Sequence, residues 1–157
     1  MNITKKQMGT IFVAFIFFGS SFAFAMNWVL PSEQKQENRL PNVFEQPLSD
    51  SQISYFLDKD ISILFLFYSD DNKDSMNQKS IAENIANTMK DRLVIEEINV
   101  REYQSVSAYY NVRYVPTIII KGEGNLNEPI RFDNLVTESD LKNSICSSYK
   151  EKPVVCV

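Results

Sequence analysis

The chain of 157 residues contains no histidine. Histidine is the commonest general base and a frequent ligand of zinc and haem, so its absence excludes Ser-His-Asp and Cys-His catalytic arrangements. Any catalytic chemistry is left to carboxylates, amines, hydroxyls and the only two cysteines, Cys146 and Cys156. We expect neither a bound metal nor a cofactor.

Positive charge is also scarce. The chain has 16 basic and 20 acidic residues, which gives a net charge of −4. Two of the basic residues, Lys5 and Lys6, stand alone at the N-terminus, so the remaining sequence is more acidic still. A protein that binds nucleic acid needs a basic patch or stripe on its surface. We therefore expect no nucleic-acid partner.

The N-terminal segment has no charged residue between positions 8 and 32. It follows Lys5 and Lys6 and is rich in Ile, Phe, Val and Ala over residues 8–26. One interpretation is a signal anchor, a hydrophobic helix that contacts the membrane through residues 8–30. The other is a signal peptide that is cleaved at Ala23-Phe24-Ala25. The first predicts a single-pass membrane protein with an extracytoplasmic domain, and the second predicts a secreted protein.

The remaining sequence divides into a linker and one domain. Residues 31–43 are mostly polar and include Pro31 and Pro41, which is typical of a linker. Residues 44–157 have the length and the apolar content of a folded domain. The predicted organisation is therefore residues 1–30 as signal anchor or signal peptide, 31–43 as linker and 44–157 as the domain.

Hydrophobic patterning predicts an α/β domain. Helices are predicted over 49–57, 75–90, 102–110 and 137–149, and strands over 61–68, 93–100, 115–121 and 129–134. The strand over 61–68 is apolar throughout, which indicates a central strand covered on both faces. Helical connections between the first three strands predict parallel crossovers, and the glycine-containing turn before the last strand predicts a hairpin. The expected architecture is a central mixed sheet flanked by helices.

Two short motifs in this order of elements resemble the thioredoxin family, with its thioredoxin and protein disulfide isomerase type domains. Phe67-Tyr68-Ser69 is similar to the end of the family's central strand, and residues 111–117 (NVRYVPT) are similar to the family's proline segment. The resemblance covers residues 44–149 and implies the thioredoxin fold. It also implies a cis bond before Pro116. The resemblance further implies that Val115, Pro116 and Thr117, called the proline edge below, bind a peptide.

The resemblance breaks where the family carries its Trp-Cys-x-x-Cys motif. Those five positions are Asp71, Asn72, Lys73, Asp74 and Ser75, so both thiols are absent. The family's reaction needs a thiolate at a helix N-terminus and a second thiol that resolves the mixed disulfide. Asn72 and Ser75 supply neither, and Leu66 stands where many members have a buried aspartate. We expect no catalytic residue in this segment.

Three interpretations of the replaced loop stay open. Asn72, Asp74 or Ser75 can cap the following helix, whose N-terminus also favours nearby aspartates. Asp70-x-Asn72-x-Asp74 matches the start of a calcium-binding EF-hand loop, although the sixth and twelfth positions of that loop do not match. The loop and the proline edge can also form a docking surface for a peptide.

The two cysteines are separated by nine residues, and Pro153 prevents one helix from containing both. Outside the cytoplasm such a pair is expected to form a structural disulfide. Closing a loop of this length stabilises a fold by about 3 kcal/mol in the chain-entropy model. A redox-active pair and free thiols are the alternatives.

These observations together predict a function class. We predict a membrane-anchored or exported thioredoxin-like domain that is redox-inactive and binds an exported polypeptide or a membrane protein. One alternative is a thiol–disulfide oxidoreductase that uses Cys146 and Cys156. Another is a structural subunit of a membrane protein complex.

Overall fold

The computed structural model of the protein describes residues 42–157. The predicted anchor or signal peptide, its hydrophobic helix and nearly all of the predicted linker lie outside these residues. No helix within residues 42–157 combines the length and the apolar character that crossing a membrane requires.

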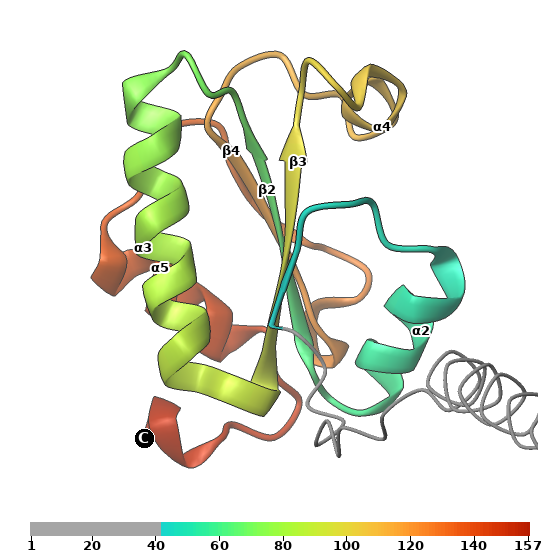
Figure 1. The fold of residues 1–157 in the computed structure, drawn as a ribbon. Helices are drawn as coiled ribbons and strands as arrows, with labels where there is room; N and C mark the ends of the chain where they lie inside the picture. Colours follow the sequence, from blue (N-terminus) through green and yellow to red (C-terminus); the bar gives the residue numbers. More distant parts are fainter. Residues whose placement is uncertain (1–41) are drawn as a thin grey trace, which may run out of the picture. The chain divides into compact units, whose positions relative to one another are not determined.

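Five strands form one mixed sheet in the order β1-β3-β2-β4-β5 (Figure 1). The strands are β1 (Val43–Phe44), β2 (Ser62–Tyr68), β3 (Leu93–Asn99), β4 (Thr117–Lys121) and β5 (Ile130–Phe132). β1 and β2 run parallel to β3, whereas β4 is antiparallel to both β2 and β5. The mixed sheet and the β4–β5 hairpin are confirmed. β1 was not predicted, because a strand of two residues leaves no hydrophobic pattern.

The direction of β4 corrects the prediction of three parallel strands. The helix between β3 and β4 has only six residues, Gln104–Tyr109. It is about 9 Å long, whereas a seven-residue strand extends over about 23 Å. The chain therefore does not return to the starting end of β3. β4 begins where β3 ends and runs back in the opposite direction.

Four helices pack on this sheet: α2 (Asp50–Asp58), α3 (Lys73–Met89), α4 (Gln104–Tyr109) and α5 (Glu138–Ser147). Short 3₁₀ helices cover Lys90–Arg92, Glu123–Asn125 and Val154–Cys156. Ser49 forms a capping box with Gln52 at the start of α2, and Thr137 accepts a hydrogen bond from the N–H of Asp140 at the start of α5. Helix α3 begins two residues earlier than predicted, because Asn72 is its N-cap.

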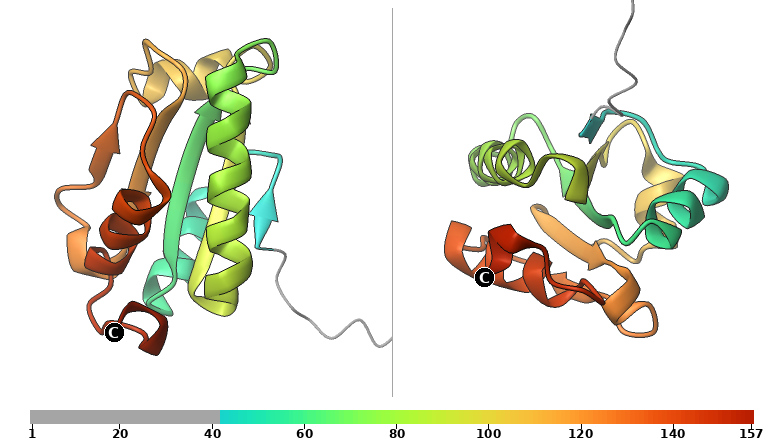
Figure 2. Two further views of the ribbon diagram at one scale, coloured as in Figure 1. Left: turned by 90° about the vertical axis from the view of Figure 1, so that its left-hand side faces the viewer. Right: turned by 90° about the horizontal axis from the view of Figure 1, so that it is seen from below.

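The helices cover both faces of the sheet, α3 and α5 one face and α2 and α4 the other (Figures 1 and 2). Alternate β2 side chains point to opposite faces, so Leu64 and Leu66 pack with α3 and α5, whereas Phe65 and Phe67 pack on the α2 side. Every residue of β2 is buried. The prediction of a central strand covered on both faces is confirmed.

The C-terminal tail is fixed at the end of the sheet where β2 begins. Ser62, the first residue of β2, lies 2.7 Å from Ser148 between their hydroxyl oxygens. A disulfide joins Cys146 in α5 to Cys156 in the tail, with the two Cα atoms 5.5 Å apart. The predicted disulfide is confirmed. The C-terminus lies at the opposite end of the sheet from the start of α3 (Figure 1).

Candidate functional site

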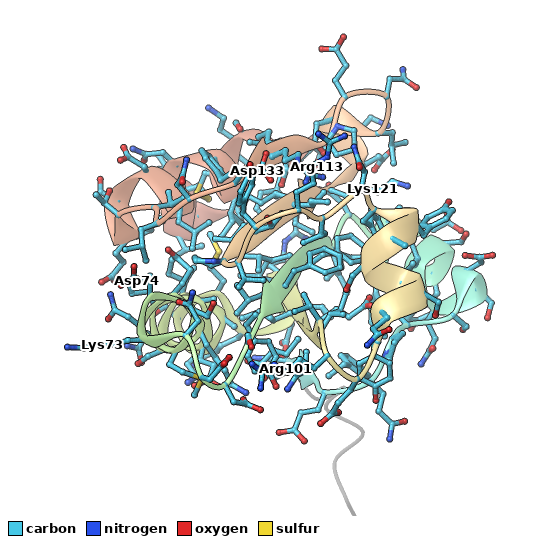
Figure 3. The ribbon with its side chains drawn as sticks, turned by 90° about the horizontal axis from the view of Figure 1, so that it is seen from above. Lys73, Asp74, Arg101, Arg113, Lys121 and Asp133 are labelled. Carbon is cyan, nitrogen blue, oxygen red and sulfur yellow. A yellow bond between two sulfur atoms is a disulfide. The ribbon has the colours of Figure 1, made fainter. Side chains whose placement is uncertain are left out.

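Three segments that are distant in sequence meet at the carboxyl end of β2. They are the start of α3, the loop before β4 and the loop between β5 and α5. Asn72 Nδ2 donates to the carbonyl oxygen of Val115 over 3.5 Å, and the N–H of Val136 donates to Gln78 Oε1 over 2.8 Å. Figure 3 looks onto this end of the domain. The positions matching the family's thiols and the proline edge therefore form one site.

Asn72, which the resemblance aligns with the family's first thiol, is the N-cap of α3. Its backbone is extended, and its Oδ1 accepts a hydrogen bond of 2.9 Å from the N–H of Ser75. The capping interpretation therefore holds for this residue. Because the oxygen is used by the helix, the NH₂ group of the same carboxamide faces Val115.

Ser75, which the resemblance aligns with the family's second thiol, is fully buried. Its Oγ has no hydrogen-bond partner within residues 42–157, and neither has Nε2 of Gln78, which lies one turn further along α3. No histidine exists to activate the Ser75 hydroxyl. A serine hydroxyl without an adjacent base is a weak nucleophile.

The bond between Val115 and Pro116 is cis, as the resemblance implies. Pro116 and Thr117 are buried, and Val115 is partly exposed. Thr117 Oγ1 lies 2.7 Å from the carbonyl oxygen of Tyr114 and 3.1 Å from Asp133 Oδ1, which holds the loop against the end of β5. Within the described part of the chain, the N–H of Val115 donates to no protein atom, and its carbonyl accepts only from Asn72.

The acidic residues of the loop are held by local bonds. Asp71 accepts from Ser69 Oγ over 2.5 Å and pairs with Arg101, and Asp70 accepts from Asn99 Nδ2 over 2.8 Å. The hydrogen bond from Ser69 is the main cause that lowers the pKa of Asp71. No group of acidic or cysteine residues between positions 42 and 157 is arranged to hold a metal ion. The cation-binding interpretation therefore gains no support here.

The surface around Val115 is mixed in character. Lys73 and Asp74 lie on its α3 side, and Arg113 and Asp133 lie on its β4–β5 side (Figure 3). Large apolar side chains from the same three segments are exposed: Met76 to 41%, Tyr114 to 69% and Leu135 to 48%. Exposed apolar and aromatic side chains beside an unpaired backbone N–H are typical of an interaction surface.

Two adjacent glutamates of β3 are buried beneath these loops. Glu97 pairs with Lys79 of α3 at 2.7 Å, and the Lys79 ammonium lies 4.7 Å from the centre of the Tyr68 ring. Glu96 points to the other face, where burial raises its pKa to about 7. Their burial was not predicted. The signal in the sequence is a pair of glutamates inside a strand that begins with three apolar residues, Leu93, Val94 and Ile95.

A sequence model of the thioredoxin family matches residues 47–147. The chain belongs to the thioredoxin family. No curated protein sequence matches it significantly. Its fold is similar to that of solved thioredoxins, and the identities are in the range that supports the fold alone. This thioredoxin-family member contains only two cysteines, Cys146 and Cys156, which are not spaced as Cys-x-x-Cys.

Three of the similar structures are thioredoxins. A point mutant of thioredoxin from Halobacterium salinarum has a TM-score of 0.55 and 23% identity, and the match covers 71% of this chain and 92% of that one. Chloroplastic thioredoxin z has a TM-score of 0.52 and 17% identity over 62% and 87% of the two chains. Thioredoxin from Fasciola hepatica has a TM-score of 0.51 and 17% identity over 62% and 92%.

Proposed function

We propose that this thioredoxin-family domain is a protein-binding module that does not use the family's dithiol chemistry. The observation that carries the proposal is Asn72. It replaces the first thiol of the family's motif, caps α3 through Oδ1 and directs its NH₂ group at the carbonyl of Val115. Because Ser75 replaces the second thiol, the loop contains no sulfur to attack a disulfide.

The proline edge supports a binding role. The N–H and C=O of Val115 are the groups that an added strand would pair with, and no backbone group between residues 42 and 157 occupies them. Strand addition at an open edge binds extended peptides through main-chain hydrogen bonds. The binding surface in this proposal is Val115, Pro116 and Thr117, together with residues 71–75.

The position of the remaining cysteines supports a structural role for them. Cys146 is 9% exposed, and its disulfide with Cys156 lies near the beginning of β2, where Ser148 contacts Ser62. Asn72 and Val115 lie at the other end of the strand. A substrate that exchanged disulfides with these cysteines would therefore not contact the proline edge at the same point.

An insulin-reduction assay of the purified full chain with dithiothreitol tests this proposal. We expect no acceleration over the uncatalysed reaction, and the same result for Cys146→Ser. If the natural chain reduces insulin and Cys146→Ser does not, the protein is instead a thiol–disulfide oxidoreductase that uses Cys146 and Cys156. A thioredoxin with its two motif cysteines serves as the positive control.

We also propose that the segment before the domain holds it on the outer face of a membrane, where its partner is an exported polypeptide or a membrane protein. The support is the uncharged apolar run over residues 8–26 behind Lys5 and Lys6. Fractionation of native cells should recover the full-length chain with the membranes. A soluble exported chain beginning at Met26 would establish cleavage instead. Co-purification from those membranes distinguishes a transient client from a stoichiometric complex in which the domain is a structural subunit.

A further inference from the structure

We infer that Asn72 is the residue by which this site recognises the main chain of an extended, unfolded peptide. The inference rests on the proposed binding function. It assigns to the same site a ligand class, extended unfolded peptides, and a residue that binds them. In this assignment a carboxamide holds the peptide by hydrogen bonds at the position where the family's motif places a thiol.

The orientation of the Asn72 side chain is set before any ligand arrives. Its Oδ1 is fixed by the hydrogen bond of 2.9 Å from the N–H of Ser75. The NH₂ group has two N–H donors, and the single acceptor it meets in residues 42–157 is the carbonyl of Val115 at 3.5 Å. That distance is at the outer limit of a hydrogen bond. A peptide that binds here would therefore replace only the weak contact between Asn72 and Val115. In return it would gain a hydrogen bond from the Asn72 amide, whose orientation is already set.

The edge offers three groups that complement a peptide backbone. Val115 supplies one N–H and one C=O, and Asn72 supplies a further N–H. A peptide residue paired with Val115 in antiparallel register accepts from its N–H and donates to its C=O. The Asn72 amide, released from Val115, then donates to the next peptide carbonyl within its reach. Only an extended chain with free backbone groups satisfies all three.

The charges around the edge favour recognition of the main chain over a charged side chain. Both signs of charge are present around it: Lys73 and Asp74 lie on the α3 side, and Asp71 and Asp133 pair with Arg101 and Arg131. Neighbouring charges of opposite sign offset one another, so they favour neither an acidic nor a basic peptide. The exposed side chains of Met76, Tyr114 and Leu135 complement apolar side chains. The ligand is thus an unfolded segment with apolar side chains.

The test uses the full chain in lipid nanodiscs, with empty nanodiscs as the blank. The probe is ribonuclease that has been reduced, unfolded and alkylated with iodoacetamide, so that it has no thiol and gains no charge. Native ribonuclease is the folded comparison. Biolayer interferometry measures the affinity for the natural chain, Asn72→Asp, Asn72→Ser and the control Asn77→Asp. Asp and Ser cap helices about as well as Asn but lack its amide donors.

We expect the natural chain to bind the unfolded probe and not native ribonuclease. Because one hydrogen bond is worth roughly 0.5–1.5 kcal/mol, both Asn72 variants should bind about three- to tenfold more weakly. Asn77 is exposed on α3, so Asn77→Asp should stay within about twofold while adding the same charge near the helix start. Nuclear magnetic resonance of the natural chain should show the Asn72 side-chain amide shifting on addition of the probe while the Asn77 amide does not.

The possible failures are distinguishable. Binding of the unfolded probe that is equal in the natural chain and both Asn72 variants overturns the role of Asn72 and leaves the binding function standing. Equal binding of native ribonuclease overturns recognition of an extended main chain. No binding by the natural chain overturns the proposed function together with this inference. The resonance measurement decides the role of Asn72 even where a variant fails to fold.

Discussion

Glu96 makes the stability of this domain depend on pH in a direction opposite to that of an ordinary surface carboxylate. Its side chain is 2% exposed and lies on the sheet face that packs with α2 and α4. Its register partner on β2 is Phe65. The backbone of Leu48 offsets part of the effect of burial on the pKa of this carboxyl, and Oε2 has no partner among the described residues. A poorly bonded carboxylate in an apolar layer strongly favours its protonated form.

The magnitude follows from the shift in pKa. Burial raises the pKa of Glu96 from 4.5 to about 7 in the folded chain. Below pH 4.5 the group is protonated in both states, so the neutral form contributes its full stability there. Between pH 4.5 and 7 the unfolded chain loses its proton first, and the folded state becomes less stable by about 1.4 kcal/mol per pH unit. The total loss is about 3 kcal/mol, and it is complete above pH 7.

Glu96→Gln replaces the carboxyl by a neutral group of the same shape. We expect the variant and the natural chain to have similar free energies of unfolding at pH 4.5. At pH 8 the variant should be more stable by up to about 3 kcal/mol, since it has no charge to bury. Urea unfolding of the full chain, followed by circular dichroism at several pH values without reductant, measures this difference.

Other titratable groups do not produce the same difference between the two proteins. Burial raises the pKa of Tyr110 to about 12, far outside this range. Burial also raises the pKa of Glu97, but Glu97 is present in both proteins, so its contribution cancels in the comparison. The exposed Glu45 provides the matched control, because Glu45→Gln should leave the pH profile unchanged. A difference between Glu96→Gln and the natural chain that stays constant from pH 4.5 to 8 would refute the reasoning. So would a carbon-13 titration of Glu96 with a midpoint near 4.5.

Three further single substitutions test the packing of the domain. Gly122→Ala should lower the free energy of unfolding by about 3 kcal/mol, because the added Cβ would lie 2.3 Å from the backbone oxygen of Ser148. Overpacking at such a close contact costs roughly 1–3 kcal/mol. A loss under about 0.5 kcal/mol, measured by urea unfolding, would contradict this contact. Cys146→Ser should cost about 3 kcal/mol, the loss expected for opening a loop of this length, and the natural chain should lose the same amount on reduction. Lys79→Met should cost about 3 kcal/mol at pH 7 because it leaves the buried Glu97 carboxyl without its ion-pair partner, and adding Glu97→Leu should recover most of the loss. A double variant no more stable than Lys79→Met would show that the ion pair does not account for the effect.

Several parts of the fold were predictable because they depend on local pattern. The unbroken apolar run of β2 indicated a strand covered on both faces, and all its residues are buried. The Ser49 and Thr137 caps mark the starts of α2 and α5, because their hydroxyls serve N–H groups only three residues away. The disulfide was predictable from the short spacing of Cys146 and Cys156.

Other parts depended on distances that no local pattern contains. The direction of β4 follows from the reach of α4, and two short helices with similar patterns can lead to opposite strand directions. β1 exists because it pairs with β3, since two residues have no periodicity of their own. The burial of Glu96 and Glu97 was missed because strand patterning assigns alternating faces but does not show that both faces are covered.

The same division applies to the site. The amino-acid sequence alone determined which chemistry is missing, because Asn72 and Ser75 contain no thiol and the chain has no histidine. It did not determine what those residues do instead. Only the tertiary structure decided that, since Asn72 and Val115 are 43 positions apart in the sequence and are brought together by the packing of α3 and β4 against β2. The missing thiols are a property of single residues, whereas the Asn72 amide facing the Val115 carbonyl is a property of their arrangement.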